Sequence, residues 1–257
     1  MSSLGRYRLV SLIARGGMGE VFRAEAVGAD GFNKPVVVKR VLPRFEGDAR
    51  FTELFAEEAK LMTRILHPNI VQVHDFGRGD DGAYFLVMEL VDGVDAGRFR
   101  REQPDTRLAS DLALFIAHQL LRGLARAHDE GLVHRDVSPE NVLLSRLGEV
   151  KLADFGVATR EPGADVRVGK LRYMSPEQHA GGVVDARADL YSLAVMLVEL
   201  LTGELPFEIT HAPHGKPKLT GNPPLDEWLQ PLLSASRDDR PTSARAVAKS
   251  LRGLRHV

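Results

Sequence analysis

The segment HRDVSPENVLL, His134–Leu144, places an acidic side chain and an asparagine five residues apart. Asp136 can accept a hydroxyl proton, and Asn141 can supply an oxygen ligand to Mg²⁺. Phosphoryl transfer uses such groups because its catalysis consists mostly of positioning and charge neutralisation. Either residue alone predicts only a capped turn, which Asp and Asn form often. Ser138 stands two positions after the aspartate.

Two further segments carry charged residues that complete such a site. KLADFG, Lys151–Gly156, offers Asp154 as a second oxygen ligand for Mg²⁺. Lys39 lies in the β-branched run PVVVKRV. An outward-facing lysine on an alternating strand is the ordinary explanation, because lysine is mostly exposed in proteins. A carboxylate partner would favour a functional role, and Glu58 on the following predicted helix is the candidate.

A glycine cluster lies between two predicted strands in IARGGMGEVF, Ile13–Phe22. Gly16, Gly17 and Gly19 lack Cβ atoms, which allows backbone N–H groups to approach phosphate oxygens closely. The cluster by itself also fits an ordinary hairpin loop. A dinucleotide-binding fold is excluded, because a strand and not a helix follows the glycines.

Composition limits the classes of protein to be considered. The chain has 257 residues, a net charge of -1 and no cysteine. The charge gives no reason to expect a nucleic-acid partner, and the lack of cysteine excludes disulfides and thiolate metal sites. No apolar run approaches the roughly 20 residues that span a bilayer, and the N-terminus lacks a signal peptide's apolar region. We therefore expect a cytoplasmic protein without a membrane segment, although a piece of a longer chain would look the same.

The first third of the chain has the pattern of a small sheet with one helix. Short β-branched and aromatic runs alternate with turn residues. A helical pattern ends at His67-Pro68, because the residue before a proline disfavours helical geometry. The predicted strands are 7–13, 20–26, 35–41, 70–76 and 83–90, and the predicted helix is 48–66.

Long helical patterns replace the strands from Ser110 onward. Apolar residues recur there at spacings of three and four, with Ser110 as the predicted N-cap and Gly131 as the terminator. The segment 189–203 is apolar on nearly every side and should be buried, and 243–254 should form a last amphipathic helix. These patterns predict an α+β fold. A small β-rich lobe with one main helix (about 1–88) precedes a hinge (about 89–93) and a larger, mostly helical lobe (about 94–257).

Nine short motifs occur in register along the chain: GGMGEVF, VVVK, EEA followed by HPNIV, VMEL, HRDVSPEN, DFG, YMSPEQ, DLYSLA and RPTSA. Over nearly its whole length the chain therefore resembles the eukaryotic-like protein kinases, especially the bacterial Ser/Thr kinases. The resemblance implies a bilobal protein-kinase-like fold. It also implies ATP as the phosphoryl donor, Mg²⁺ as the cofactor, and protein substrates that carry Ser or Thr.

The resemblance assigns a role to each charged residue of the site. Asp136 is the base, and Asn141 and Asp154 hold the metal ion. Lys39 contacts the α- and β-phosphates and pairs with Glu58. Elsewhere in the larger lobe, Glu177 and Arg240 form a buried ion pair, and Asp189 braces the catalytic loop. In the family, Arg135 would pair with a phosphorylated activation-loop residue. Here we predict that Asp165 or Glu161 is its permanent partner; the alternative is a loop held by a partner protein.

The resemblance also assigns the nucleotide site. The glycine turn covers the phosphates, while Glu89 and Val91 bond adenine through their backbones in front of Met88. Val21, Val37 and Leu143 enclose the ring. The complete set of expected nucleotide-binding residues is Ile13, Ala14, Arg15, Gly16, Gly17, Met18, Gly19, Val21, Val37, Lys39, Glu89, Val91 and Leu143.

Four positions of the expected site depart from the family pattern. Ala14 replaces the first glycine of the loop, and Val37 replaces a small alanine beside adenine. Ser138 replaces the lysine of the catalytic loop, while Lys170 replaces the threonine before LRYMSPEQ. The last two exchange a hydroxyl and an ammonium group. We predict that Lys170 supplies the charge that Ser138 lacks; the alternative is that Lys170 faces solvent or binds acidic substrate residues.

The leading hypothesis for function is an ATP- and Mg²⁺-dependent protein Ser/Thr kinase. The catalytic loop lacks the Ala-Ala-Arg type of signature that tyrosine kinases carry. One alternative is a pseudokinase that acts as a nucleotide-binding or interaction scaffold, and another is a kinase-fold enzyme for small molecules. The sequence leaves open the protein substrate, the upstream signal and the oligomeric state.

Overall fold

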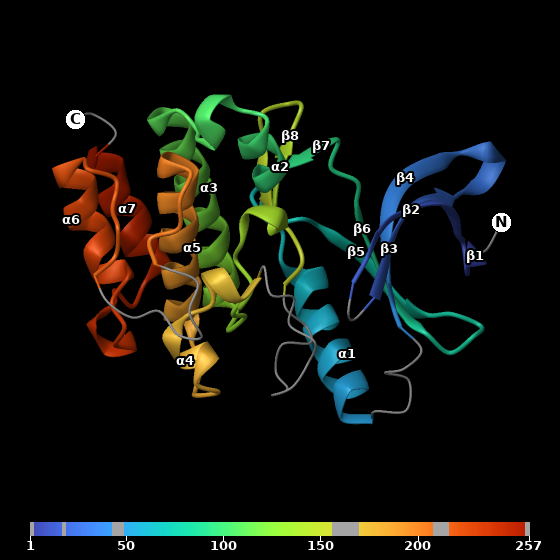
Figure 1. Ribbon diagram of the computed structural model, residues 1–257. Coiled ribbons are helices and arrows are strands. Elements are labelled where there is room, and N and C mark those ends of the chain that lie inside the picture. The colour runs from blue at the N-terminus through green and yellow to red at the C-terminus, as the bar shows by residue number, and fades with distance from the viewer. Residues whose placement is uncertain (1–2, 17–18, 43–48, 156–169, 208–215, 255–257) are drawn as a thin grey trace. The chain divides into compact units, whose positions relative to one another are not determined.

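The structure is a computed structural model that describes residues 3–16, 19–42, 49–155, 170–207 and 216–254. The chain divides into two compact units, and each is described in turn. The N-terminal unit contains the residues up to Asp92 except Pro68–Ile70, which belong with the C-terminal unit that continues from Gly93. Figure 1 shows both units coloured along the chain, with labels on elements where there is room.

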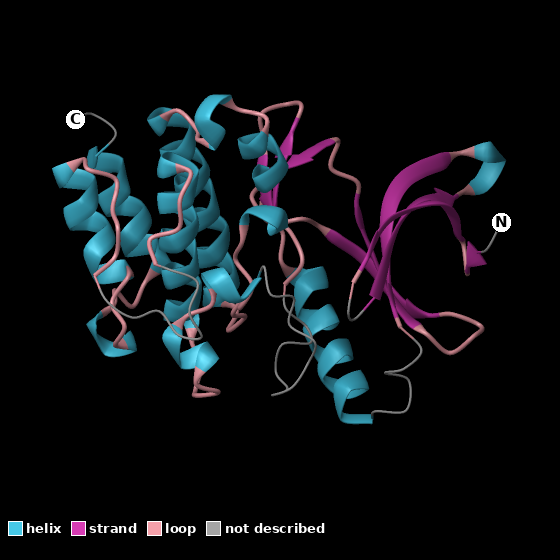
Figure 2. Ribbon diagram, viewed as in Figure 1, coloured by secondary structure: helices cyan, strands magenta, loops and turns pink. Residues whose placement is uncertain are grey.

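The N-terminal unit is built on a six-stranded antiparallel sheet (Figure 2). Its strand order is β1-β2-β3-β4-β6-β5, so only β5 and β6 interrupt the sequential order. The strands are β1 (Ser3–Leu4), β2 (Tyr7–Arg15), β3 (Gly19–Val27), β4 (Asn33–Val41), β5 (Val73–Arg78) and β6 (Tyr84–Glu89), and a 3-10 turn, Ala29–Gly31, joins β3 to β4.

Side-chain alternation divides this sheet into two faces. Val36 and Val38 of β4 are buried, whereas Val37 and Lys39 between and after them are only half-buried. The buried face is an apolar cluster, and removing its side chains from water stabilises the fold. Its members are Leu4, Tyr7, Leu9, Ala24, Val36, Val38, Phe85 and Val87. Lys39 therefore points away from that cluster.

One helix, α1 (Ala49–Arg64), completes the N-terminal unit. Phe55, Ala59 and Met62 are buried at helical spacing, and the Phe55 ring lies 5.8 Å from the Phe76 ring of β5. The helix ends at Arg64, two residues before the predicted end at 66. Ile65 N–H bonds the Met62 carbonyl there in a tighter turn ahead of Pro68.

The C-terminal unit is mostly helical and carries a small three-stranded sheet in the order β7-β8-β9. Both strand pairs of that sheet are antiparallel. The elements are β7 (Gly93–Asp95), α2 (Ala96–Arg101), α3 (Ser110–Asp129), β8 (Val142–Ser145), β9 (Val150–Leu152), α4 (Pro176–His179), α5 (Ala186–Thr202), α6 (Pro223–Leu232) and α7 (Ala244–Leu254), with short 3-10 turns at Pro104–Thr106, Pro139–Asn141, Lys170–Tyr173 and Arg237–Asp239.

Helix α5 is buried along nearly its whole length, as its uniformly apolar sequence predicts. Asp185 caps its start by accepting a hydrogen bond from Arg187 N, and Gly203 ends it in the left-handed region at φ 80°. Gly131 likewise follows α3 at φ 74°, which confirms it as the terminator of that helix. Glycine tolerates this geometry because it has no Cβ atom.

Two local predictions are wrong. Ser110 is not the N-cap of α3, because Ala113 N–H already bonds Ala109 and so makes Ser110 the first helical residue. The predicted strand 70–76 is also misplaced at its start, because Ile70 forms a parallel bridge with Leu152 in the C-terminal unit and β5 begins only at Val73. A backbone hydrogen bond sets the start of α3, and a tertiary contact of Ile70 delays the start of β5.

The class of fold agrees with the prediction: a sheet-rich N-terminal unit with one main helix and a mostly helical C-terminal unit. Within the described residues, no helix combines the length and the apolar character that crossing a bilayer requires.

Candidate active site

The catalytic-loop backbone is held by a carboxylate from helix α5. Asp189 is fully buried, and its oxygens accept hydrogen bonds from His134 N at 2.8 Å and Arg135 N at 2.7 Å. His128 Nε2 lies 2.7 Å from the same carboxylate. Arg135 has a positive φ of 65°, an unfavourable conformation that persists only where surrounding contacts hold it. The predicted bracing role of Asp189 is confirmed.

Asp136 and Asn141 are brought into direct contact. Asn141 Nδ2 donates to Asp136 Oδ2 at 2.9 Å and to the Asp136 carbonyl at 2.7 Å. The 3-10 turn Pro139–Asn141 creates this proximity by folding the chain back over Ser138, whose carbonyl accepts from Asn141 N. Both side-chain bonds use Nδ2, so Oδ1 is the carboxamide atom that can coordinate a cation.

His134 joins the loop to the strand that carries Asp154. Its Nδ1 accepts from Asp136 N at 3.2 Å, so its Nε2 carries the proton and donates to the Ala153 carbonyl at 3.0 Å. Complete burial lowers the pKa of His134 below its usual 6.5, which keeps the ring neutral. Ala153 N in turn donates to the Asn141 carbonyl at 2.8 Å. These bonds place residue 154 beside the loop.

The side-chain oxygens of this region suit Mg²⁺ better than a metal ion that prefers sulfur or nitrogen ligands, or one that needs three or more protein ligands. The described residues contain no group of three His, Cys, Asp or Glu side chains that could enclose a metal. Asn141 and Asp154 offer two oxygen ligands from adjacent backbone segments. Mg²⁺ is commonly held in this way, by one or two protein oxygens together with phosphate oxygens and water.

The Ser138 hydroxyl oxygen has no hydrogen-bond partner in the described part of the chain. The Ser138 side chain is 1% exposed, and Ser138 Oγ has no hydrogen-bond partner among the described residues. A buried hydroxyl without a partner costs about 1–3 kcal/mol, and such groups are few in native proteins. The atom is therefore a candidate contact for a bound substrate group, in the turn between Asp136 and Asn141.

Lys39 and Glu58 both lie in the N-terminal unit. Lys39 is half-buried on β4 and is directly opposite Val21 of β3 in the strand register. Val37 is two residues away on the same strand and so shares this face. Glu58 is a carboxylate with only 7% exposure on α1. The pairing of Lys39 with Glu58 stays a prediction.

The structure explains why one position of the glycine turn, Gly19, requires glycine. Gly16 N donates to the Gly19 carbonyl at 2.8 Å and closes the turn between β2 and β3. A Cβ atom on Gly19 would lie 2.5 Å from the Arg40 carbonyl oxygen, so the neighbouring strand alone excludes a side chain there. Gly17 and Met18 lie outside the described residues. Phosphate binding by Ile13, Ala14, Arg15 and the glycines stays a prediction.

The predicted adenine contacts are distributed over both units. Glu89 N already donates to the Gln72 carbonyl at 2.9 Å, so a bond from Glu89 to adenine would have to use its carbonyl oxygen. Leu143 lies on β8, opposite Lys151 of β9. Enclosure of the ring by Val21, Val37 and Leu143, and the contact with Val91, stay predictions.

Residues 7–249 match the family model described as the protein kinase domain. This chain belongs to the protein kinase family. The expected family and its α+β fold are thereby confirmed.

Bacterial protein kinases are among its relatives. The tyrosine-protein kinase MasK of Myxococcus xanthus (strain DK1622) is 37% identical over 280 residues, which cover 96% of this chain and 42% of that protein. Serine/threonine-protein kinase pkn3 of Myxococcus xanthus is 37% identical over 97% of this chain and 50% of its own length. The chain thus spans about half or less of these two relatives.

A solved structure has the same architecture as this kinase. The crystal structure of the M. tuberculosis PknI kinase domain superposes with a TM-score of 0.82 and 32% sequence identity. The match covers 100% of this chain and 98% of that domain.

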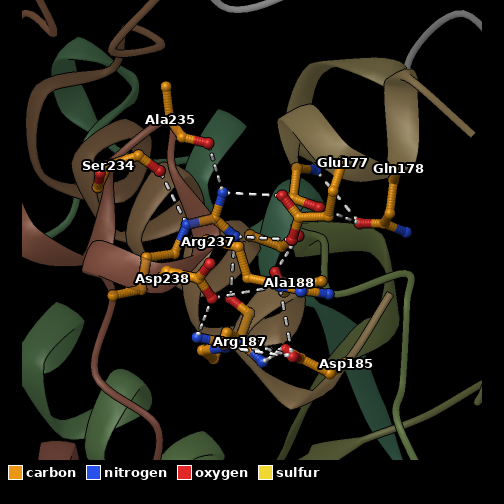
Figure 3. Close-up of polar contacts among 12 residues, drawn as sticks. Glu177, Gln178, Asp185, Arg187, Ala188, Ser234, Ala235, Arg237 and Asp238 are labelled. Atoms are coloured by element: carbon orange, nitrogen blue, oxygen red, sulfur yellow. Dashed lines mark hydrogen bonds and ion pairs between the residues drawn. The ribbon is translucent and has the colours of Figure 1, made fainter. Parts of the chain in front are cut away.

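The kinase also contains the predicted buried ion pair. Arg240 Nη1 and Nη2 donate to the two carboxylate oxygens of Glu177 at 2.7 and 2.8 Å, and the Arg240 side chain has no exposed surface. Arg240 Nε donates to the Ser234 carbonyl, and the guanidinium lies over the Tyr191 ring. Figure 3 shows the polar contacts around Glu177 and Gln178. The pair ties α4 to the segment before α7.

Gln178 is a residue whose role the sequence interpretation missed. Gln178 Nε2 donates to the Arg135 carbonyl at 2.9 Å, and Gln178 Oε1 accepts from Ser175 N and Ser175 Oγ. The S-x-x-Q spacing of SPEQ is a capping signal that would have located the Ser175 contact. No local pattern indicates the contact with Arg135, which is 43 residues away in the chain.

A second polar network that the interpretation missed anchors the same segment to α5. Tyr173 OH donates to Glu199 Oε2 at 2.6 Å, and Arg100 Nη2 donates to Glu199 Oε1 at 2.9 Å. Burial and the neighbouring Glu199 carboxylate raise the pKa of Tyr173. Its hydroxyl therefore stays protonated and serves as a donor. Asp165 and Glu161, the predicted partners of Arg135, lie outside the described residues.

Proposed function

We propose that this domain transfers the γ-phosphoryl group of ATP to Ser or Thr hydroxyls of protein substrates, with Mg²⁺ as the cofactor. The observation that carries the proposal is the contact of Asp136 with Asn141, in a loop whose backbone is fixed by buried Asp189. A scaffold has no chemical need for a carboxylate oriented in this way. Membership of the kinase family and the names of the relatives support the same reaction.

In the proposed reaction Asp136 accepts the proton of the substrate hydroxyl as the oxygen attacks the γ-phosphorus, and the bond from that phosphorus to the bridging oxygen breaks to release ADP. Asn141 fixes the direction of that carboxylate through Nδ2, and Asn141 Oδ1 and Asp154 would hold Mg²⁺. Bound Mg²⁺ would neutralise charge on the phosphate oxygens. Lys39 would contact the α- and β-phosphates.

Serine or threonine is favoured as the acceptor by the lack of an Ala-Ala-Arg type of signature in HRDVSPEN. Serine/threonine-protein kinase PknL of Mycobacterium tuberculosis (strain ATCC 25618 / H37Rv) supports this assignment at 35% identity over 97% of this chain. MasK, by contrast, is named a tyrosine-protein kinase. Phosphoamino-acid analysis of a phosphorylated protein substrate separates the two acceptors.

The decisive experiment compares phosphotransfer with nucleotide binding in the Asp136→Asn variant. We expect the variant to bind Mg²⁺-ATP nearly as well as the wild type and to lose phosphotransfer, because only the proton acceptor is removed. Asp154→Asn should lose phosphotransfer and also weaken Mg²⁺-dependent nucleotide binding.

Asp105→Asn is the matched control, because Asp105 is exposed and its positive φ of 55° suits asparagine. Undiminished autophosphorylation in Asp136→Asn protein would refute the assignment of the base. A wild-type domain that binds Mg²⁺-ATP but phosphorylates no protein would support the pseudokinase alternative, and phosphorylation of small hydroxyl compounds alone would support a small-molecule kinase.

We also propose that Lys170 supplies the positive charge absent from position 138. Ser138 Oγ is buried without a partner among the described residues, so a hydroxyl in that turn can contact a substrate oxygen. The Lys170 side chain lies outside the described residues, and its part in the proposal rests on the sequence exchange alone.

A further inference from the structure

Two different helices hydrogen-bond the backbone of Arg135, one at its N–H and one at its carbonyl. Its N–H donates to Asp189 Oδ1 of α5, and its carbonyl accepts from Gln178 Nε2 of α4. Its φ of 65° is unfavourable for a residue with a side chain. The two contacts therefore oppose relaxation of Arg135 toward a more common conformation.

The carboxamide of Gln178 makes a separate contact with each of its two polar atoms. Oε1 accepts from Ser175 N at 3.2 Å and Ser175 Oγ at 3.0 Å, so Nε2 must be the atom that faces the Arg135 carbonyl. The Ser175 contact is a capping arrangement that glutamate supports equally well. The donor contact to Arg135 is not required for capping.

The Arg135 carbonyl belongs to the peptide unit whose nitrogen is Asp136 N. Asp136 N donates to His134 Nδ1, and the Asp136 carboxylate accepts from Asn141. A rotation of this peptide would therefore displace the base. Displacements of about 1 Å in a catalytic group can reduce rates by about a hundredfold.

We propose that Gln178 is a positioning residue that couples the segment 170–178 to the catalytic base through the Arg135 carbonyl; this inference rests on the kinase function proposed above. Order in the segment 170–178 is then required for correct placement of Asp136. The segment is itself anchored to α5 by the hydrogen bond of Tyr173 to Glu199.

Two substitutions at position 178 distinguish the donor contact of Gln178 with Arg135 from its acceptor contact with Ser175. Gln178→Glu retains an oxygen for Ser175 and replaces the donor with a carboxylate against a carbonyl. Gln178→Lys retains a donor within reach of the Arg135 carbonyl and loses the acceptor for Ser175. Gln103→Glu is the control, because Gln103 Nε2 also donates to a carbonyl, that of Phe99, at the end of α2.

Steady-state kinetics with a protein or peptide substrate provide the first test. We expect Gln178→Glu to lower kcat by about tenfold to a hundredfold with little change in the KM for ATP. Gln178→Lys should lose less kcat than Gln178→Glu, and Gln103→Glu should match the wild type. A Gln178→Glu variant with normal kcat, or a Gln178→Lys variant that is the more impaired of the two, would overturn the proposal.

Amide hydrogen exchange provides a test that does not depend on activity. We expect Gln178→Glu to raise the exchange of the His134, Arg135 and Asp136 amides, whereas loss of a cap alone would raise exchange in Ser175–His179 only. Exchange confined to Ser175–His179 would overturn the coupling. If the wild type fails to phosphorylate protein but the loop amides respond, the proposed function fails while the coupling stands.

Discussion

Ser138 is the catalytic-loop residue whose chemistry departs furthest from the family pattern. The loop around it is otherwise fully connected, since His134, Asp136 and Asn141 each make side-chain hydrogen bonds within it. Among the described loop residues, Ser138 Oγ is the one fully buried side-chain polar atom that lacks a hydrogen-bond partner. The departure thus concerns one side chain and leaves the geometry of the base intact.

At this scale, we expect Lys170→Ala to lower kcat by roughly 10²–10³, about 3–4 kcal/mol, the effect of losing one preorganised group at the transition state. The KM for peptide should change little, because a docking lysine would mainly raise KM. The change Ser138→Lys combined with Lys170→Thr should recover much of the kcat that Lys170→Thr loses. Steady-state kinetics measure these effects.

Lys249→Ala is the control, because Lys249 is exposed on α7. A near-normal kcat in Lys170→Ala would show that Lys170 does not replace the positive charge absent from position 138. Ser138 would then be expected to make this kinase slower than relatives with lysine there.

Elements of the C-terminal unit are joined by the buried pair of Glu177 and Arg240. The Arg240 side chain is fully enclosed, and its remaining donors reach the carbonyls of Ser234, Ala235 and Arg187. The pair therefore connects α4, the start of α5 and the turn after α6. Removing one partner would leave a buried charge without compensation.

We expect Arg240→Leu to reduce the free energy of unfolding by about 3–5 kcal/mol, because the Glu177 side chain, only 13% exposed, would lose the guanidinium that compensates its charge. Arg98→Ala is the matched control. Its ion pair with Glu102 is more than half exposed on both sides, and such pairs contribute about 0–1 kcal/mol. Urea unfolding measures both variants, and equal losses in the two would contradict the structural role of the buried pair.

Across the whole molecule, two carboxyl groups and two histidines have lowered pKa values in the folded state, and all four make the fold less stable as the pH falls. Burial would raise the pKa of Glu177, but the hydrogen bonds and positive charge of Arg240, together with a backbone and a Ser175 hydrogen bond, lower that pKa below its usual 4.5. Burial would likewise raise the pKa of Asp185, and the hydrogen bonds from Arg187 lower it. Burial lowers the pKa of His134, and of His74 with help from Lys34. In each case the unfolded chain binds the proton more readily.

We therefore expect the free energy of unfolding to be highest above pH about 6.5 and to fall on acidification. Each histidine contributes at most about 1.4 kcal/mol per pH unit below 6.5, and Glu177 adds to the loss once the pH falls below about 4.5. Denaturant unfolding at pH 7.5, 6.0, 5.0 and 4.0 measures this.

NMR of the His134 imidazole is the independent check, with a neutral ring protonated on Nε2 expected at pH 6.5. His74→Gln should retain the part of the pH dependence that comes from His134. A stability that stays constant between pH 7.5 and 5.0, or a charged His134 ring at pH 6.5, would contradict the prediction.

Much of this fold follows from local sequence. Runs of β-branched residues predict the strands around Lys39, and a helix apolar on every side predicts the burial of α5. Gly131 and Gly203 mark helix ends because few other residues adopt a positive φ easily. The motifs in register also indicate the kinase family. These properties depend on backbone preference and on which face is apolar, and both are encoded within a few residues.

Other properties depend on the tertiary structure. Ile70 joins Leu152, Asp189 accepts from His134 and Arg135, and Gln178 reaches the Arg135 carbonyl. These partners are 43 or more residues apart in the chain, and no local pattern specifies them. Hydrogen bonds require distances near 3 Å and correct angles, so only the packing of complete elements can decide which polar groups meet.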